Sequence, residues 1–126
     1  MYIFIFIHSY IYIQNYVFIH NCASNKEISI DITKFKNNNI LVINPNKNMY
    51  NLGDDMYKIA NEFIGHPILH YLEVISKANE LHLIDSSFSC LSALYLNKNI
   101  FNQKRYIYSR NNERYPDLFD NTWVYM

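Results

Sequence analysis

The sequence predicts an α/β domain of three layers, in which helices flank a mostly parallel sheet of about four or five strands. Short apolar runs typical of buried strands alternate along the chain with segments whose apolar residues recur at helical spacing. Such alternation implies parallel strands joined by crossover connections. The 126 residues, of which 50% are hydrophobic, are enough for one domain with a core and too few for two.

Four runs have the composition of strands, and these are 16–20 (YVFIH), 40–43 (ILVI), 81–84 (LHLI) and 105–109 (RYIYS). The second is fully apolar and is closed by Asn44, Pro45 and Asn46, which is the pattern of a buried parallel strand. Isoleucines alternate with polar residues over 28–32, so we expect a further short extended piece there.

Helical spacing appears between these runs. A short helical turn is expected to begin at Asp31 or Thr33, and the segment 48–64 is a loop that leads into a helix. Pro67 suits the first turn of a third helix, because the N–H groups of that turn have no acceptor within the helix and proline lacks an N–H. A fourth helix is expected over 88–95.

The stretch 79–96 (NELHLIDSSFSCLSALYL) changes from strand to helix within about four residues. Asp85, Ser86 and Ser87 stand at the change. The start of a helix leaves backbone N–H groups unpaired and carries a partial positive charge, so phosphates bind there readily. Asp and Ser are also preferred N-caps of ordinary helices, so capping is a competing interpretation of the same residues.

Two further strand ends carry polar residues. His20 ends the run 16–20, Asn21 and Ser24 follow it, and Arg110 follows the run 105–109. Ligands of open α/β sheets bind beyond the carboxyl ends of the strands, so we expect these residues in a binding crevice. Arg110 is suited to a bidentate bond with phosphate or carboxylate. A histidine that only covers the sheet, and an arginine that is only a solvated loop charge, remain the alternatives.

Composition excludes several functions. Lysines and arginines number 11, aspartates and glutamates also number 11, and no basic run dominates, which argues against a nucleic-acid binder. Cys22 and Cys90 are too few for a disulfide framework or a zinc ribbon, so we expect free thiols in a reducing, cytoplasmic setting. Either cysteine as a nucleophile would need a partnered base. His66 and His70 have the spacing of a metal pair, but structural histidines are favoured and no metal or cofactor is expected.

Residues 1–15 form a hydrophobic N-terminal segment of uncertain status, which we separate from the domain 16–126. Aromatic residues and isoleucine alternate in it, which favours extended structure or a start that is not a native domain edge. It lacks the positive start and small-residue cleavage site of a signal peptide, and polar residues interrupt it before the length of a membrane span. Membrane association is therefore not expected.

The run 66–96, with its LIDSSFS turn, resembles the C-terminal half of GT-B glycosyltransferases of the fucosyltransferase-like kind and their uncharacterised relatives. The segments 16–26 (YVFIHNCASNK) and 106–112 (YIYSRNN) are also similar to those relatives, in which a first strand ends in histidine and a last one runs into arginine. The resemblance covers about 16–123. It implies a Rossmann-like domain that binds a nucleotide-sugar donor.

The resemblance also implies roles for individual residues. Ser86, Ser87 and the backbone amide of Phe88 would face the pyrophosphate, with Asp85 orienting the turn. His20 and Asn21 would line the same crevice. Arg110 would neutralise charge on the leaving diphosphate, which fits the general need for preorganised donors where negative charge develops.

The sequence departs from this family in three respects. A GT-B enzyme has two such domains and this chain has room for one, the strand-end HxRxxD motif is absent, and the domain that would bind the glycan acceptor is missing. We therefore expect the donor-binding half of a glycosyltransferase, a fragment inactive alone. The alternatives are a small non-catalytic α/β binding or interaction domain, and a membrane-associated protein anchored by residues 1–14.

Overall fold

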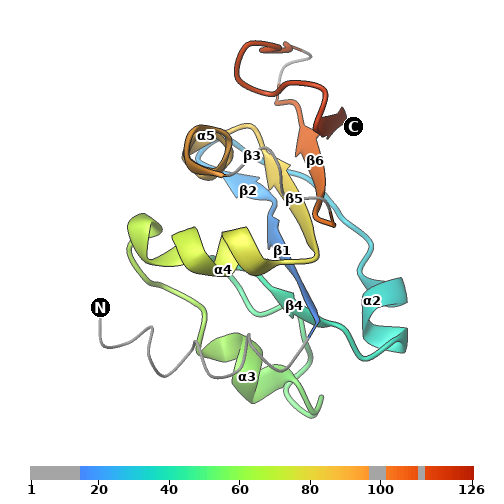
Figure 1. The fold of residues 1–126 in the computed structure, drawn as a ribbon. Coiled ribbons are helices and arrows are strands. Elements are labelled where there is room, and N and C mark those ends of the chain that lie inside the picture. Colours follow the sequence, from blue (N-terminus) through green and yellow to red (C-terminus); the bar gives the residue numbers. More distant parts are fainter. Residues whose placement is uncertain (1–14, 97–101, 111–112) are drawn as a thin grey trace.

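The computed structural model describes residues 15–96, 102–110 and 113–126, so the expectations for residues 1–14 lie outside the described residues. A five-stranded parallel sheet forms the centre of the molecule, in the order β4-β1-β5-β6-β7 (Figure 1). Its strands are β1 (Tyr16–His20), β4 (Leu41–Ile43), β5 (Glu80–Ile84), β6 (Lys104–Tyr108) and β7 (Trp123–Tyr125). The expected parallel α/β sheet is confirmed.

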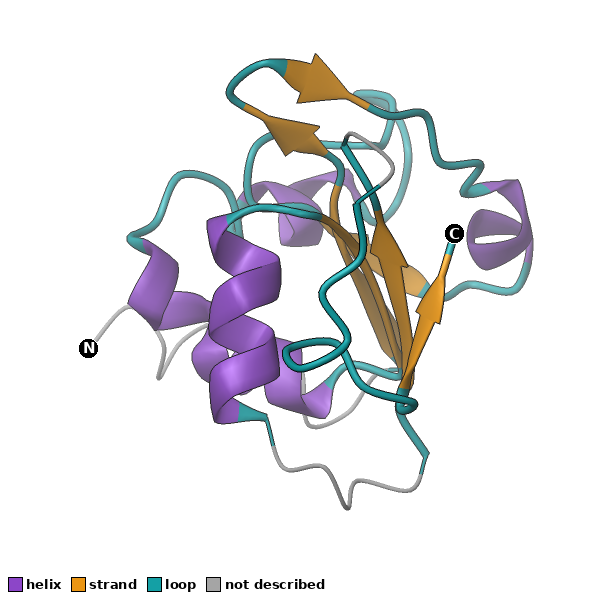
Figure 2. Ribbon diagram, turned by 90° about the horizontal axis from the view of Figure 1, so that it is seen from above, coloured by secondary structure: helices purple, strands orange, loops and turns teal. Residues whose placement is uncertain are grey.

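Helices cover both faces of the sheet, which confirms the three layers. They are α2 (Thr33–Asn37), α3 (Tyr57–Asn61), the 3₁₀ helix η1 (Ile68–Tyr71), α4 (Leu72–Lys77) and α5 (Ser87–Tyr95). Figures 1 and 2 show α2 on one side of the sheet and α4 and α5 on the other. Pro67 precedes the helix at the expected place, but the first turn is 3₁₀. The helix expected after the loop at residue 48 is only five residues long.

Aromatic rings join the sheet to the α4 and α5 side. The ring centroid of Phe18 on β1 lies 5.9 Å from that of Tyr71 and 5.9 Å from that of Phe88, and the rings of Tyr71 and Phe88 lie 5.6 Å apart. The Tyr16 hydroxyl donates to the Val74 carbonyl at 2.6 Å. Phe18 and Tyr71 are fully buried, so this cluster fixes α4 and α5 against β1 and β5.

Three short strands were not expected from the sequence. β7 lies near the C-terminal end of the chain, where the sequence analysis predicts no strand, and β2 (Cys22–Ala23) pairs antiparallel with β3 (Lys26–Glu27) in a small hairpin. The expected extended piece at 28–32 is not a strand, because the chain there crosses from the hairpin to α2 without a sheet partner.

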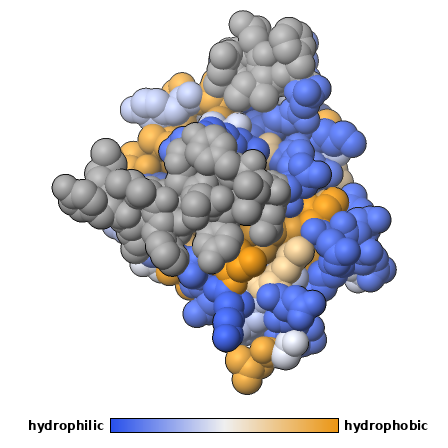
Figure 3. Space-filling model, turned by 60° about the horizontal axis from the view of Figure 1, so that its bottom comes forward, coloured by the Kyte–Doolittle hydropathy of each residue, from blue (hydrophilic) through white to orange (hydrophobic). Residues whose placement is uncertain are grey.

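No helix among the described residues is both long and apolar enough to cross a membrane. On the side of the molecule shown in Figure 3, hydrophobic and hydrophilic residues both reach the surface. Mixed surface of this kind is normal for a folded domain and by itself indicates no partner.

The order of the strands fixes where a ligand is expected. From β1 the chain passes through α2 to β4 on one side, and it then returns across the other face to β5 on the opposite side of β1. In open α/β sheets, ligands bind outside the carboxyl ends of the strands at the point where the order reverses. Here that point lies between the ends of β1 and β5.

Candidate functional site

A cavity of about 400 Å³ lies at the carboxyl ends of β1 and β5. Its walls come from the end of β1, the β2–β3 hairpin, the loop after β4, the start of α5 and the end of β6. The lining residues are His20, Cys22, Ala23, Ser24, Asn46, Ser86, Ser87, Phe88 and Arg110. The structure therefore brings together His20, Ser86, Ser87, Phe88 and Arg110, all of which were proposed from the sequence to share one crevice.

His20 is held in the wall of this cavity by two contacts. Its Nδ1 lies 3.2 Å from Ser86 Oγ, and its ring centroid lies 4.4 Å from that of Phe88. Burial lowers the pKa of His20 to about 4, because the charged imidazolium loses its hydration there. The imidazole is therefore neutral near pH 7 and adds no positive charge to the cavity.

The first turn of α5 is closed by a capping box in which Ser86 is the N-cap and Ser89 the third helical residue. The Ser86 backbone N–H donates to Ser89 Oγ at 2.9 Å. Ser86 Oγ in turn accepts the Ser89 backbone N–H, which leaves its hydroxyl hydrogen for His20. The capping interpretation therefore applies to Ser86 and Ser89, and both are structural residues whatever else the site does.

Ser87 differs from its two neighbours in this turn. Its side chain is exposed and lines the cavity. The backbone N–H groups of Ser87 and Phe88 are among the first of the helix, for which a helix offers no internal acceptor. These groups and the Ser87 hydroxyl are the hydrogen-bond donors that the start of α5 offers to an anion.

Arg110 reaches the cavity from the other side, just beyond the end of β6. Its Nη1 donates to Asn25 Oδ1 at 3.3 Å, and its carbonyl oxygen accepts a hydrogen bond from Lys26 Nζ at 3.0 Å. Arg110 is half-buried, and the one hydrogen bond that its guanidinium donates among the described residues is long, so the side chain can turn toward a ligand. The cavity thus combines a cation with the positive end of α5.

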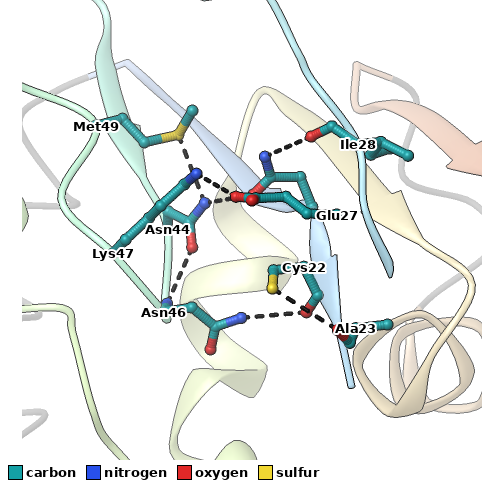
Figure 4. Close-up of polar contacts among 9 residues, drawn as sticks. Cys22, Ala23, Glu27, Ile28, Asn44, Asn46, Lys47 and Met49 are labelled. Atoms are coloured by element: carbon teal, nitrogen blue, oxygen red, sulfur yellow. Dashed lines mark hydrogen bonds and ion pairs between the residues drawn. The ribbon is translucent and has the colours of Figure 1, made fainter. Parts of the chain in front are cut away.

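Asn21 and Asp85 do not line this cavity. The Asn21 side chain is buried, donates from Nδ2 to the Ile28 carbonyl at 2.8 Å and accepts from Asn44 Nδ2 at 2.9 Å (Figure 4). Asn21 is the first residue after β1, and these two bonds hold its side chain outside the cavity. Asp85 joins β5 to β6, since its backbone N–H donates to the Tyr108 carbonyl at 2.9 Å.

Three lining residues were missed by the sequence analysis, namely Cys22, Ala23 and Asn46. Asn46 follows the buried strand β4, so the rule that selected His20 and Arg110 could also have selected it. Asn46 Nδ2 donates to the Cys22 carbonyl at 3.3 Å, which connects the loop after β4 to the hairpin (Figure 4). The hairpin residues carried no such signal, because a two-residue strand has no recognisable pattern.

Within the described residues, no group of three or more His, Cys, Asp and Glu side chains is arranged to hold a metal ion. His66 Nε2 instead lies 2.6 Å from the Glu62 carbonyl oxygen. Cys22 and Cys90 are free thiols. Burial raises the pKa of Cys90, with the Asp85 carboxylate acting in the same direction, and this disfavours the nucleophilic thiolate.

The geometry thus describes a crevice lined by Arg110 and the start of α5, at the position where the sheet order predicts a ligand site. Comparison of the chain with protein-family models, with curated proteins and with solved structures finds no match.

Proposed function

We propose that this domain binds the diphosphate of a nucleotide sugar in the cavity between β1 and β5, and that it is the donor-binding half of a glycosyltransferase. The observation that carries the proposal is the joint position of Arg110 and the start of α5 on one cavity at the reversal of the sheet order. Helix amides and a guanidinium are the groups that proteins commonly use to bind phosphate.

The character of the other walls is consistent with this ligand. A volume of about 400 Å³ suits a small ligand, and the neutral His20, Ser24 and Asn46 offer hydrogen-bonding groups without adding negative charge. The assignment to nucleotide sugars, rather than to other phosphate esters, rests on the resemblance to GT-B enzymes. That resemblance also assigns the glycan acceptor and the catalytic base to a second domain.

One observation favours a second function, that of a non-catalytic binding or interaction domain. The capping box and the contact with His20 give the side chains of Ser86 and Ser89 complete structural roles. In this case the polar turn exists only to start α5, and no nucleotide binds.

A thermal-shift titration of the full chain against GDP, UDP, GDP-fucose and UDP-sugars distinguishes the two functions. A ligand that binds only the folded state raises the melting temperature by mass action, so even weak binding is visible at high concentration. The donor-site proposal predicts a saturable increase with at least one of these compounds. If none of them raises the melting temperature of a folded sample, the non-catalytic function is supported instead.

The variant Arg110→Ala sharpens the test. We expect the affinity for the diphosphate that binds to fall by about tenfold or more, because a charge-assisted hydrogen bond contributes roughly 1.5–3 kcal/mol. The melting temperature without ligand should change little, since among the described residues the guanidinium donates only the 3.3 Å bond to Asn25. Lys58→Ala on α3 is the control, because Lys58 is exposed and does not line the cavity. Equal affinity in Arg110→Ala and the parent removes Arg110 from the site.

A further inference from the structure

The β2–β3 hairpin forms one wall of the cavity and carries a lysine at its tip. Cys22, Ala23 and Ser24 line the cavity, and Lys26 follows two residues later at the start of β3. Two bonds connect the tip to the end of β6, one from Lys26 Nζ to the Arg110 carbonyl at 3.0 Å and one from Arg110 Nη1 to Asn25 Oδ1 at 3.3 Å. The hairpin thereby brings a second cation to the side of the cavity that Arg110 occupies.

Neither Lys26 nor Arg110 forms an ion pair with a carboxylate among the described residues. By contrast, three other lysines each pair with a carboxylate, and these are Lys36 with Asp54, Lys47 with Glu27, and Lys77 with Glu73. A ligand with two negative groups can pair with both side chains at once, because Lys26 Nζ lies against the backbone of Arg110.

The partners of Lys26 and Arg110 are also easily exchanged for a ligand. Each cation now contacts a neutral oxygen, a carbonyl for Lys26 and an amide oxygen for Arg110, at the exposed surface. Phosphate oxygens form stronger, charge-assisted bonds with both side chains. The other edge of the hairpin is held separately, by the ion pair of Glu27 with Lys47 and by the bond from Asn46 to the Cys22 carbonyl, so the hairpin keeps its place when the cations turn.

We infer that Lys26 is the residue by which this site selects a diphosphate over a monophosphate. The start of α5 and Arg110 hold one phosphoryl group, and Lys26 at the tip of the hairpin contacts the other. This inference rests on the proposed function, because it assigns the second phosphoryl group of the same ligand.

Inorganic pyrophosphate and inorganic phosphate test the inference without knowledge of the nucleotide. Their dissociation constants are measured by isothermal titration at low salt for the full parent chain and for Lys26→Met, which keeps most of the side-chain length and removes the charge. We expect the affinity for pyrophosphate to fall by about tenfold and that for phosphate by less than about twofold. Lys26→Arg should restore the preference, and Lys58→Met, which removes the same charge far from the cavity, should behave as the parent.

The inference is overturned if Lys26→Met binds pyrophosphate with the same affinity as the parent. It is also overturned if the variant loses affinity for pyrophosphate and phosphate equally, because Lys26 would then attract any anion by its charge alone. Failure of the proposed function gives a different result, since the parent then binds neither the anions nor any nucleotide sugar. If nucleotide sugars bind while Lys26→Met leaves the pyrophosphate preference unchanged, the proposed function stands and only the role of Lys26 is lost.

Discussion

Acidification should destabilise the protein through His20, and the variant His20→Gln should remove this part of the pH dependence. His20 is only 5% exposed, and burial holds the pKa of its imidazole at about 4, against 6.5 in the unfolded chain. The folded state therefore binds fewer protons than the unfolded state between these two pH values. The free energy of unfolding must then fall as the pH falls from about 6.5 to about 4, and it must level off below that range.

The magnitude follows from the two pKa values. A tenfold change in proton affinity corresponds to about 1.4 kcal/mol, so the full effect of His20 is about 3 kcal/mol. Between about pH 7 and about pH 5, the unfolded chain takes up most of a proton at this imidazole and the folded chain takes up little, which makes the loss about 2 kcal/mol. Burial also lowers the pKa of His82, whose contribution has the same sign and is common to parent and variant.

Urea denaturation at the two pH values measures this loss directly. The single tryptophan, Trp123, is buried and reports unfolding by its fluorescence. Glutamine does not titrate over this range and can keep a hydrogen bond to Ser86, although the ring contact with Phe88 is lost. We therefore expect the variant to have a lower free energy of unfolding than the parent at both pH values. On acidification, however, that free energy should fall by about 2 kcal/mol less in the variant than in the parent.

Two results would refute the reasoning. In the first, the parent and His20→Gln lose the same free energy of unfolding between the two pH values, to within about 0.5 kcal/mol. That margin is well below the expected difference of about 2 kcal/mol between the two proteins. The other comes from NMR, where the ring protons of His20 would titrate near the value of a free imidazole, about 6.5. Either finding would mean that the imidazole is hydrated, so that the wall of the cavity is more open than the structure describes.

Two further variants test the structural roles of residues around the cavity. Ser89→Ala removes one half of the capping box and should lower the free energy of unfolding by about 1 kcal/mol, measured by urea denaturation, without weakening nucleotide or pyrophosphate binding. Asn44→Ala leaves the buried Oδ1 of Asn21 without its partner and should cost about 1–3 kcal/mol in the same assay. Asn38→Ala, at an exposed amide that bonds only the Lys34 carbonyl in the described structure, is the matched control for it and should cost less.

The part of the fold that the sequence predicts is the part fixed by burial on both faces of the sheet. β1, β4 and β5 are apolar runs whose pattern needs no knowledge of their neighbours, and each forms where expected. β7 instead depends on pairing with β6, in which Trp123 lies opposite Arg105 and Tyr125 opposite Ile107. A three-residue strand of this kind has no periodicity of its own, so only the folded chain reveals it.

The candidate site likewise contains residues that the sequence predicts and residues that only the folded structure reveals. Ser86, Ser87 and Phe88 were predictable because the change from strand to helix is encoded within a few neighbouring residues. Asn21 was assigned to the crevice because it follows His20, but its buried side chain pairs with Asn44 and does not line the cavity. The two asparagines are 23 positions apart in the chain, so this pairing cannot be predicted from neighbouring residues.

The approach of Lys26 to Arg110 has no counterpart in the sequence. The two residues are separated by 84 positions and meet only because β1 and β6 lie on either side of β5 in a parallel sheet, so that their carboxyl ends face the same edge. The overall charge of the chain is zero, and neither residue belongs to a basic run. Composition argues against a broad positive surface, but it does not reveal that the fold brings Lys26 to Arg110 beside the cavity. A site for a small dianion requires only that local concentration of charge.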